Sequence, residues 1–106
     1  MYWTAIADGN KVRLNWNVEQ EQDVVKYDIE KSADGLNFSF LLSVASLQKN
    51  AWLYTAFDYS PFTGWNYYRL KITDRTNKIS YAGIRKVRFD KGLQVVQVFP
   101  NPTTDV

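Results

Sequence analysis

Strict alternation of apolar and polar residues is the feature of this sequence that most constrains its fold. In the first clear run, Val12, Leu14 and Trp16 alternate with lysine, arginine and asparagine. Successive side chains of a β-strand point to opposite faces, so this pattern places the three apolar side chains on one face. The same two-residue period returns at residues 26–31 and 68–73, and no stretch shows a convincing 3.6-residue period. The pattern therefore predicts half-buried strands rather than helices.

Turn-forming residues separate the strand-like runs. Asp8-Gly9-Asn10, Asp34-Gly35 and Gly64 allow tight reversals or a positive φ, and residues 46–52 are expected to form a loop. Short runs at this spacing predict an all-β, antiparallel sandwich of about seven strands in a single domain. The expected strands lie near residues 3–5, 11–17, 26–31, 38–44, 54–57, 66–73 and 79–89.

The inward-facing residues predict a core between two sheets. A tryptophan on an early strand and a tyrosine on a later strand can pack side by side there, and aromatic residues make up 16% of the chain. We expect Trp16 and Tyr68 at the centre of this core. Around them we expect apolar residues of the neighbouring strands, namely Leu14, Ile29, Leu70, Ile72 and Val87.

The composition excludes several kinds of chemistry. The sequence contains no histidine and no cysteine, so it lacks the usual proton shuttle, the commonest metal ligand, thiolate nucleophiles and disulfides. No glycine-rich phosphate loop is present. The acidic residues Glu19, Glu21 and Asp23 lack the glycine-punctuated spacing of a calcium loop, so we interpret them as a solvated loop. We expect no catalytic residue, no metal site and no cofactor.

Two carboxylates share one strand face. Asp28 and Glu30 lie two residues apart, about 7 Å along a strand, a separation that glycoside hydrolysis could use. An open, solvated strand face does not desolvate an acid, so we expect both carboxylates to pair with lysines on an outer face.

Charge is unevenly distributed along the chain. The net charge is only +2, yet six acids lie between Glu19 and Asp34 and eight bases between Arg69 and Lys91. We expect these groups to meet as cross-strand pairs, with a functional basic stripe as the alternative. Arg69 and Lys71 alternate with Tyr67 and could stack on bases, but we favour a solvated sheet face and expect no nucleic-acid partner. No apolar run is long enough for a membrane span, and we expect no membrane insertion.

Four aromatic residues fall outside the alternating pattern, in predicted loops or at strand starts. Exposed aromatic patches tend to mark binding surfaces, and sugar rings can stack on flat aromatic faces. Three interpretations stay open: a plug for the end of the sandwich, a carbohydrate platform, or contact with a neighbouring domain. The four candidate ligand-binding residues are Trp52, Tyr59, Phe62 and Trp65.

The end of the chain differs from the rest. Asp90-Lys91-Gly92 breaks the pattern, and residues 93–99 form a strand-like run that a seven-strand sandwich does not need. Pro100 and Pro102 then enforce extended geometry on the residues before them. We therefore expect a sandwich over residues 2–90 and a linker over residues 91–106.

Several strand and turn motifs follow one another in a consistent order and spacing along the chain. They are Trp3-Thr4-Ala5, Val12-x-Leu14-x-Trp16 with Glu21, Tyr27-x-Ile29-Glu30-Lys31-Ser32, Asp34-Gly35 with Phe38, Tyr54, Asp58, Gly64-x-Asn66-Tyr67-Tyr68-Arg69-Leu70-Lys71 and Asp74. This ordered set resembles the fibronectin type III-like module that precedes the C-terminal sorting domain of secreted Bacteroidetes proteins. The turn after Asp74 departs from that pattern, because it reads Arg75-Thr76-Asn77-Lys78 where Asp-Gly is usual. The tail Val98-Phe99-Pro100-Asn101-Pro102-Thr103 resembles the opening of a type IX secretion sorting domain, which normally continues for several more strands.

The resemblance implies a location and a role. It implies an immunoglobulin-like fold and a parent protein that is secreted or attached to the bacterial cell surface, although no signal peptide is recognisable in this chain. The expected function is that of a non-catalytic, monomeric spacer or interaction module whose partners are neighbouring domains of the same polypeptide. The alternative is a carbohydrate- or adhesion-type binding module, with a polysaccharide or another surface ligand as partner.

Overall fold

The computed structural model describes residues 1–19, 23–48 and 52–90, and every regular element among them is a β-strand. None of these residues forms a helix that could span a membrane. The prediction of an all-β chain with about seven strands is therefore confirmed. The strands are β1 (Tyr2–Asp8), β2 (Lys11–Val18), β3 (Val24–Ser32), β4 (Ser39–Ala45), β5 (Trp52–Asp58), β6 (Gly64–Asp74) and β7 (Ile79–Phe89).

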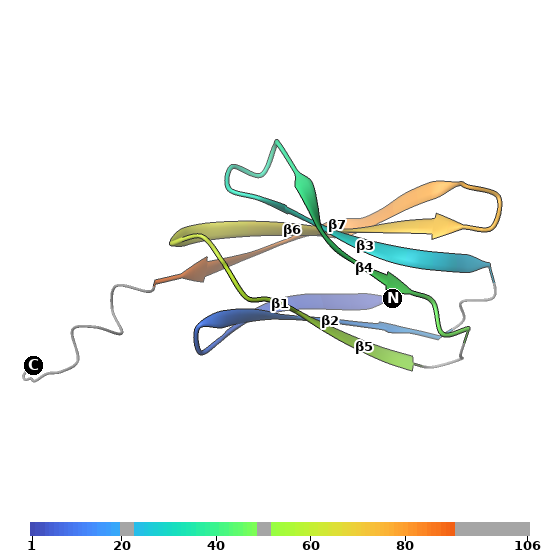
Figure 1. The fold of residues 1–106 in the computed structure, drawn as a ribbon, viewed down its shortest axis with the longest axis horizontal. Helices are drawn as coiled ribbons and strands as arrows, with labels where there is room; N and C mark the ends of the chain where they lie inside the picture. The colour runs from blue at the N-terminus through green and yellow to red at the C-terminus, as the bar shows by residue number, and fades with distance from the viewer. Residues whose placement is uncertain (20–22, 49–51, 91–106) are drawn as a thin grey trace, which may run out of the picture.

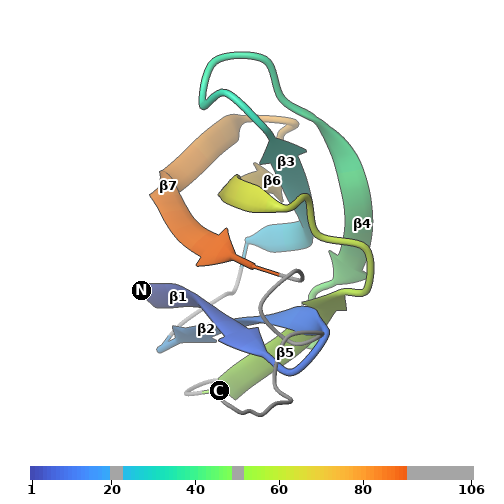
Figure 2. The same ribbon diagram turned by 90° about the vertical axis from the view of Figure 1, so that its left-hand side faces the viewer.

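The strands form two antiparallel sheets. One sheet has the order β1-β2-β5 and the other the order β4-β3-β6-β7 (Figure 1). Figure 2 shows the two sheets stacked as separate layers, with β1 beneath β7 along one side. This is the immunoglobulin-like sandwich expected from the sequence. The predicted linker, its strand-like run at residues 93–99 and the sorting-domain start lie outside the described residues.

Aromatic rings fill the space between the sheets. The ring of Trp16 stacks on Tyr54 at 5.2 Å between centroids, and Tyr27 packs against both at a tilt. Of the core residues expected from the sequence, Leu14, Trp16, Ile29, Tyr68 and Leu70 are fully buried. Ile72 and Val87 are half-buried and pack against the margin of the same core, whereas Trp3, Val12, Val18 and Phe89 also lie inside it.

Hydrogen bonds tie the two layers together along the side where β1 meets β7. The Trp3 indole N–H donates to the carbonyl of Gly83 at 2.7 Å, and Arg85 Nε donates back to the carbonyl of Trp3 at 2.8 Å. The register of β6 with β7 shifts between Tyr68 and Leu70, which is the signature of a β-bulge next to Gly83. The bulge leaves a carbonyl free to bond across the layers.

The turn before β4 folds onto the outer face of the four-stranded sheet. Gly35 adopts a φ of 77°, and a Cβ atom there would lie 3.3 Å from the ring of Tyr67. Only glycine combines this backbone conformation with so close an approach. The Asp34-Gly35 motif therefore both reverses the chain and covers Tyr67.

Candidate functional site

The four candidate aromatic residues do not form one surface. Trp52 begins β5, while Tyr59 follows the last residue of that strand, Asp58. Six strand steps separate Trp52 from Asp58, a distance of about 20 Å, and the side chain of Trp52 lies outside the described part of the structure. Tyr59 is 72% exposed, and Phe62 and Trp65 are each 43% exposed. Three of the four therefore lie near one end of the sandwich, and Trp52 lies near the other.

Each of the three has different neighbours. Tyr59 packs at a tilt against Phe57, with 5.7 Å between the ring centroids. Phe62 lies beneath the ammonium of Lys31, which is 4.3 Å from its ring centroid. Trp65 lies on β6 opposite Arg88, and its ring contacts cations of β7 on the outer face of the four-stranded sheet. Phe62 thus partly covers the end of the sandwich, whereas Trp65 belongs to a sheet face.

A buried charged network, which includes the Lys31 ammonium, lies next to Phe62. Lys31 Nζ is 2.8 Å from Asp58 Oδ2, and it also donates to the carbonyl of Ser60 at 2.7 Å. The Tyr68 hydroxyl donates to Asp58 Oδ2 at 2.7 Å, while the backbone N–H of Ser60 donates to Asp58 Oδ1. Burial, reinforced by the hydrogen bond and the charge of Asp58, raises the pKa of Tyr68 well above its usual range. These groups fasten β3 of one sheet to β5 of the other.

The loop that presents Phe62 is held by a fully buried asparagine. The backbone N–H of Phe62 donates to Asn66 Oδ1 at 2.8 Å. Asn66 Nδ2 donates to the carbonyls of Phe62 and Gly64 at 2.8 and 3.2 Å. All the hydrogen-bonding atoms of this amide are therefore used to shape the turn into β6.

The expectation that Asp28 and Glu30 lie on an open face is wrong for Asp28. Asp28 is only 6% exposed, with Lys26 Nζ at 3.6 Å from its Oδ2, and its Oδ1 has no hydrogen-bond partner among the described residues. Its cross-strand neighbours are Ser43 and Lys71. Long side chains that lie flat along a sheet cover a short aspartate, which the alternation pattern alone does not reveal.

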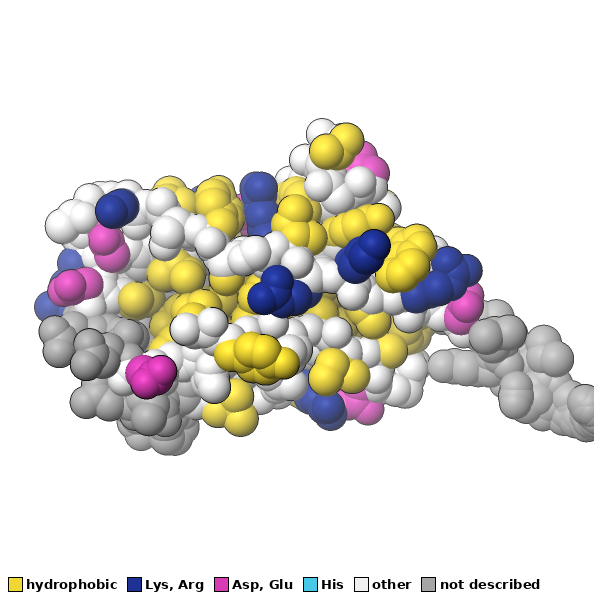
Figure 3. All heavy atoms as spheres, turned by 180° about the vertical axis from the view of Figure 1, so that it is seen from behind, with side chains coloured by type: hydrophobic (Ala, Val, Ile, Leu, Met, Phe, Trp, Pro, Cys, Tyr) yellow, Lys and Arg dark blue, Asp and Glu magenta, His cyan; other side chains and the backbone are white. Residues whose placement is uncertain are grey.

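The expected cross-strand pairing between the acidic and basic runs occurs once among the described residues. Arg69 Nε donates to Glu30 Oε1 at 2.6 Å, and the Arg69 guanidinium lies between the rings of Phe38 and Tyr81, 4.4 and 4.5 Å from their centroids. Lys71 forms no ion pair in the part of the chain that the structure describes. Seen from behind, Lys and Arg side chains lie scattered among hydrophobic ones rather than in one basic patch (Figure 3).

Two aspartates, the exposed Asp34 and the half-buried Asp74, organise turns. Asp34 accepts hydrogen bonds from the backbone N–H groups of Leu36 and Asn37 and from the Asn37 amide, which hold its pKa well below the usual range. Asp74 accepts from the Thr76 hydroxyl and the Lys78 N–H, and its pKa is lowered for the same reason. Within the described residues, no group of three or more acidic side chains is placed to hold a metal ion. Glu21 of the acidic loop lies outside them.

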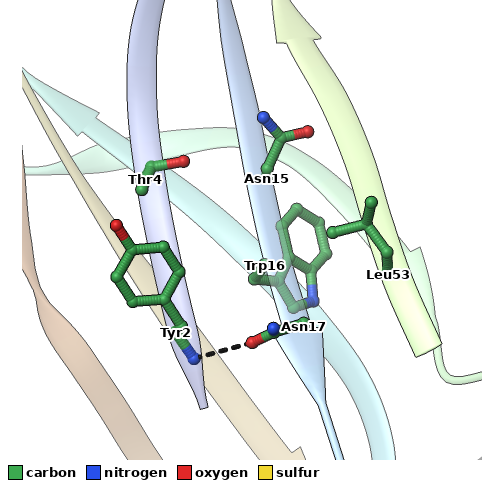
Figure 4. Close-up of a pocket in the computed structure, with 6 residues that line it drawn as sticks. All are labelled: Tyr2, Thr4, Asn15, Trp16, Asn17 and Leu53. Atoms are coloured by element: carbon green, nitrogen blue, oxygen red, sulfur yellow. Dashed lines mark hydrogen bonds between the residues drawn. The ribbon is translucent and has the colours of Figure 1, made fainter. Parts of the chain in front are cut away.

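The sequence interpretation missed a groove on the outer face of the three-stranded sheet. A hollow of about 280 Å³ lies over one end of that sheet (Figure 4). Alternation correctly placed Asn15 and Asn17 on an outer face, but it could not say which residues of other strands would stand beside them. The hollow is lined by Tyr2, Thr4, Asn15, Trp16, Asn17 and Leu53.

Comparison with known proteins supports the fold alone. No protein-family model matches the chain, and no curated protein matches it. Among solved structures, the chain is similar to pectate lyase Pel3 from Pectobacterium carotovorum in two crystal structures. For the Pel3 crystal structure with two monomers in the asymmetric unit, the TM-score is 0.62 and the sequence identity is 14%, over 79% of this chain and 25% of that chain. For the Pel3 crystal structure with one monomer, the TM-score is 0.64 and the sequence identity is 11%, over 98% of this chain and 28% of that chain. The chain therefore spans about a quarter of the length of these enzymes.

Proposed function

We propose that this chain is a non-catalytic spacer and interaction module of a larger secreted or cell-surface bacterial protein, placed before the C-terminal sorting segment of that protein. The observation that carries the proposal is the use of the interior polar groups. Lys31, Asp58, Tyr68 and Asn66 are each committed to contacts that join strands or shape a turn. These contacts fasten the two sheets and the turn into β6, and none of the four groups is left as a nucleophile or base facing a cleft among the described residues.

The direction of the strands supports a spacer role. In Figure 1, β1 begins toward the right-hand side of the molecule, and β7 runs to the left-hand end, where Phe89 is its last residue. A sandwich entered toward one end and left at the other separates whatever is joined to it by much of its own length.

The proposal is tested by locating the protein in the organism that makes it. An antiserum raised against residues 2–90 should detect a polypeptide clearly longer than 106 residues, in the culture medium or on intact cells that are accessible to added protease. Replacing residues 2–90 of that polypeptide with an unrelated sandwich of similar length should leave its secretion unchanged. Detection only in the cytoplasm, or a polypeptide no longer than this chain, would contradict the proposal.

A binding role for the aromatic end of the sandwich is the second candidate function. Tyr59, Phe62 and Trp65 keep more than two-fifths of their surface exposed, so a carbohydrate or an adhesion partner could contact the solvent-facing part of each ring. A Tyr59→Ala, Trp65→Ala double variant keeps the buried network and removes two of these rings. Loss of retention on an insoluble polysaccharide in this variant, with an unchanged melting temperature, would assign binding to this surface.

A further inference from the structure

The groove on the three-stranded sheet is built from two uncharged rows of side chains. Pairing of β1 with β2 and of β2 with β5 aligns Tyr2, Asn17 and Leu53 in one row. The next row contains Thr4, Asn15 and Thr55. All six side chains point to the outer face, because the residues between them, such as Trp16, are buried in the core. The groove is therefore uncharged, with a few polar groups set among apolar surface.

Among the described residues, the charged side chains of this face lie beyond the two rows. Arg13 occupies the following row, where its Nη1 is 3.2 Å from Asp8 Oδ2, so its charge is already paired. Glu19 follows β2 beyond Asn17 and is exposed. An anionic ligand would meet one neutralised cation at one end of the groove and a carboxylate at the other.

The two asparagines of the groove use their oxygens within the protein and leave their nitrogens free. The backbone N–H of Tyr2 donates to Asn17 Oδ1 at 3.0 Å, and the Thr55 hydroxyl donates to Asn15 Oδ1 at 2.9 Å. Neither Nδ2 has a hydrogen-bond partner among the described residues. In Figure 4, the Asn15 oxygen lies on the side of β5, and its nitrogen lies on the side of β1.

The free donors have a defined spacing. Asn15 and Asn17 are two residues apart on β2, so their amide groups stand about 7 Å apart along the strand. Each Nδ2 carries two N–H donors, and internal hydrogen bonds already fix the orientation of the amides. A ligand that accepts hydrogen bonds at repeated positions would bind these amides with little further loss of side-chain freedom.

Apolar surface flanks these donors. Tyr2 is 68% exposed and Leu53 is 61% exposed, at opposite sides of the row that contains Asn17. The Tyr2 ring offers a flat face with a hydroxyl at its tip, and Thr4 offers a second hydroxyl. Pockets that bind organic ligands combine aromatic surface with a few fixed polar groups in this way, commonly within about 300 to 1,000 Å³. The volume of about 280 Å³ suits a short segment of a longer ligand.

We propose that this groove binds a neutral polysaccharide chain. Such a chain presents hydroxyl and ring oxygens as acceptors at regular intervals, apolar C–H faces for the Tyr2 ring, and no charge that would need a counter-ion. A polyuronate or a nucleic acid would bring anions to two rows that hold no cation, and Arg13 of the following row is already paired with Asp8. An extended peptide fits the groove less well, because on the face of a sheet its backbone groups cannot form hydrogen bonds with a strand edge. The site is separate from the surface of Phe62 and Trp65, and it does not depend on the proposed spacer function.

The test is binding of the full chain to soluble neutral polysaccharides, namely xyloglucan, galactomannan and mixed-linkage β-glucan, with polygalacturonate as the anionic comparison. Affinity gel electrophoresis at about 0.5 M salt identifies the polymer that binds, and calorimetry then gives its Kd. An Asn15→Asp, Asn17→Asp double variant keeps both internal acceptor oxygens and replaces each free amide nitrogen with a carboxylate oxygen, which cannot donate and adds a negative charge. Its Kd for a neutral polymer should rise by about tenfold for each amide replaced, which corresponds to about 1.4 kcal/mol per amide.

Two further variants make the result specific. Tyr2→Ala removes the ring and should also weaken binding by about tenfold or more, while the backbone N–H that bonds Asn17 is kept. Trp65→Ala, on the other sheet, should leave the Kd unchanged, and melting temperatures show whether each variant stays folded. The proposal is overturned if no neutral polymer binds, if only polygalacturonate binds, or if Trp65→Ala abolishes binding while the asparagine variant does not.

Discussion

The buried pair of Lys31 and Asp58 offers the sharpest test of how this sandwich is held together. Their charged atoms are 2.8 Å apart, and their side chains are 10% and 1% exposed. Removing one partner of a buried ion pair typically costs about 3–5 kcal/mol, because an uncompensated charge stays behind. Since Lys31 keeps some contact with water, we place the expected cost of Asp58→Asn at the lower end, about 3 kcal/mol.

The two single substitutions should differ. Asp58→Asn leaves the Lys31 ammonium with the carbonyl of Ser60 as its remaining partner. Lys31→Met keeps a side chain of similar shape and leaves Asp58 with the donors of Tyr68 and Ser60, so it should cost less, about 2 kcal/mol. The Lys31→Met, Asp58→Asn double variant removes both charges. It should cost less than the sum of the single changes by about 1–3 kcal/mol.

Thermal unfolding followed by circular dichroism, together with urea titration, measures these differences. For a domain of this size, about 3 kcal/mol lowers the melting temperature by roughly 12–24 °C. The matched control is Asp8→Asn, which breaks the pair with Arg13 at 3.2 Å, where both side chains are 39% exposed. An exposed pair is worth about 0–1 kcal/mol. If Asp58→Asn were no more destabilising than Asp8→Asn, or if the single costs simply added, the network would not fasten the sheets as argued.

Three further predictions concern the core and the titrating groups. Trp16→Ala should lower the free energy of unfolding by about 3–5 kcal/mol. Trp16→Phe should lower it much less, because the buried indole N–H that it removes has no partner among the described residues. Chemical denaturation measures both differences. Tyr68 has a raised pKa, so its share of stability is present below about pH 10 and is lost at higher pH, where the unfolded tyrosine ionises. Tyr68→Phe should therefore flatten the fall of melting temperature above pH 10, and an equally steep fall would contradict this. Asp34 has a lowered pKa, so Asp34→Asn should destabilise the fold above about pH 4, and the difference from the unsubstituted protein should shrink as the pH falls below the unfolded pKa toward the lower native one. A difference that stayed constant between about pH 5 and about pH 2 would refute that.

The fold was predictable because the alternation is local. Each strand carries its own period of two, so residues such as Leu14 and Trp16 show their inward face without knowledge of any partner strand. The ends of strands were less predictable. β3 begins at Val24, earlier than the alternation around Tyr27 indicated, because its first residues pair across an irregularity with Thr73 and Asp74 of β6.

Contacts between strands were not predictable in the same way. The pattern placed Lys31 on the inward side of β3, but its partner Asp58 is distant in sequence and belongs to the other sheet. Nothing near Lys31 in the sequence indicates that partner. The same limit explains Asp28, which is buried although it alternates with the inward-facing residues of β3. It also explains Trp52, which the sequence grouped with Tyr59 although β5 separates them.

Contacts between strands also determine which outer face of the sandwich has hydrogen-bonding groups available to a ligand. On the four-stranded sheet, Arg69 is already bonded to Glu30 and packed between Phe38 and Tyr81, so a ligand there would have to replace existing contacts. On the three-stranded sheet, the side-chain nitrogens of Asn15 and Asn17 have no hydrogen-bond partner among the described residues. A ligand that bonded to them would displace water rather than a protein group. A hydrogen bond exchanged for water contributes a modest net gain, whereas breaking a satisfied charged group costs more. The neutral groove, rather than the more aromatic and basic face, is therefore where this sandwich has binding free energy still unused.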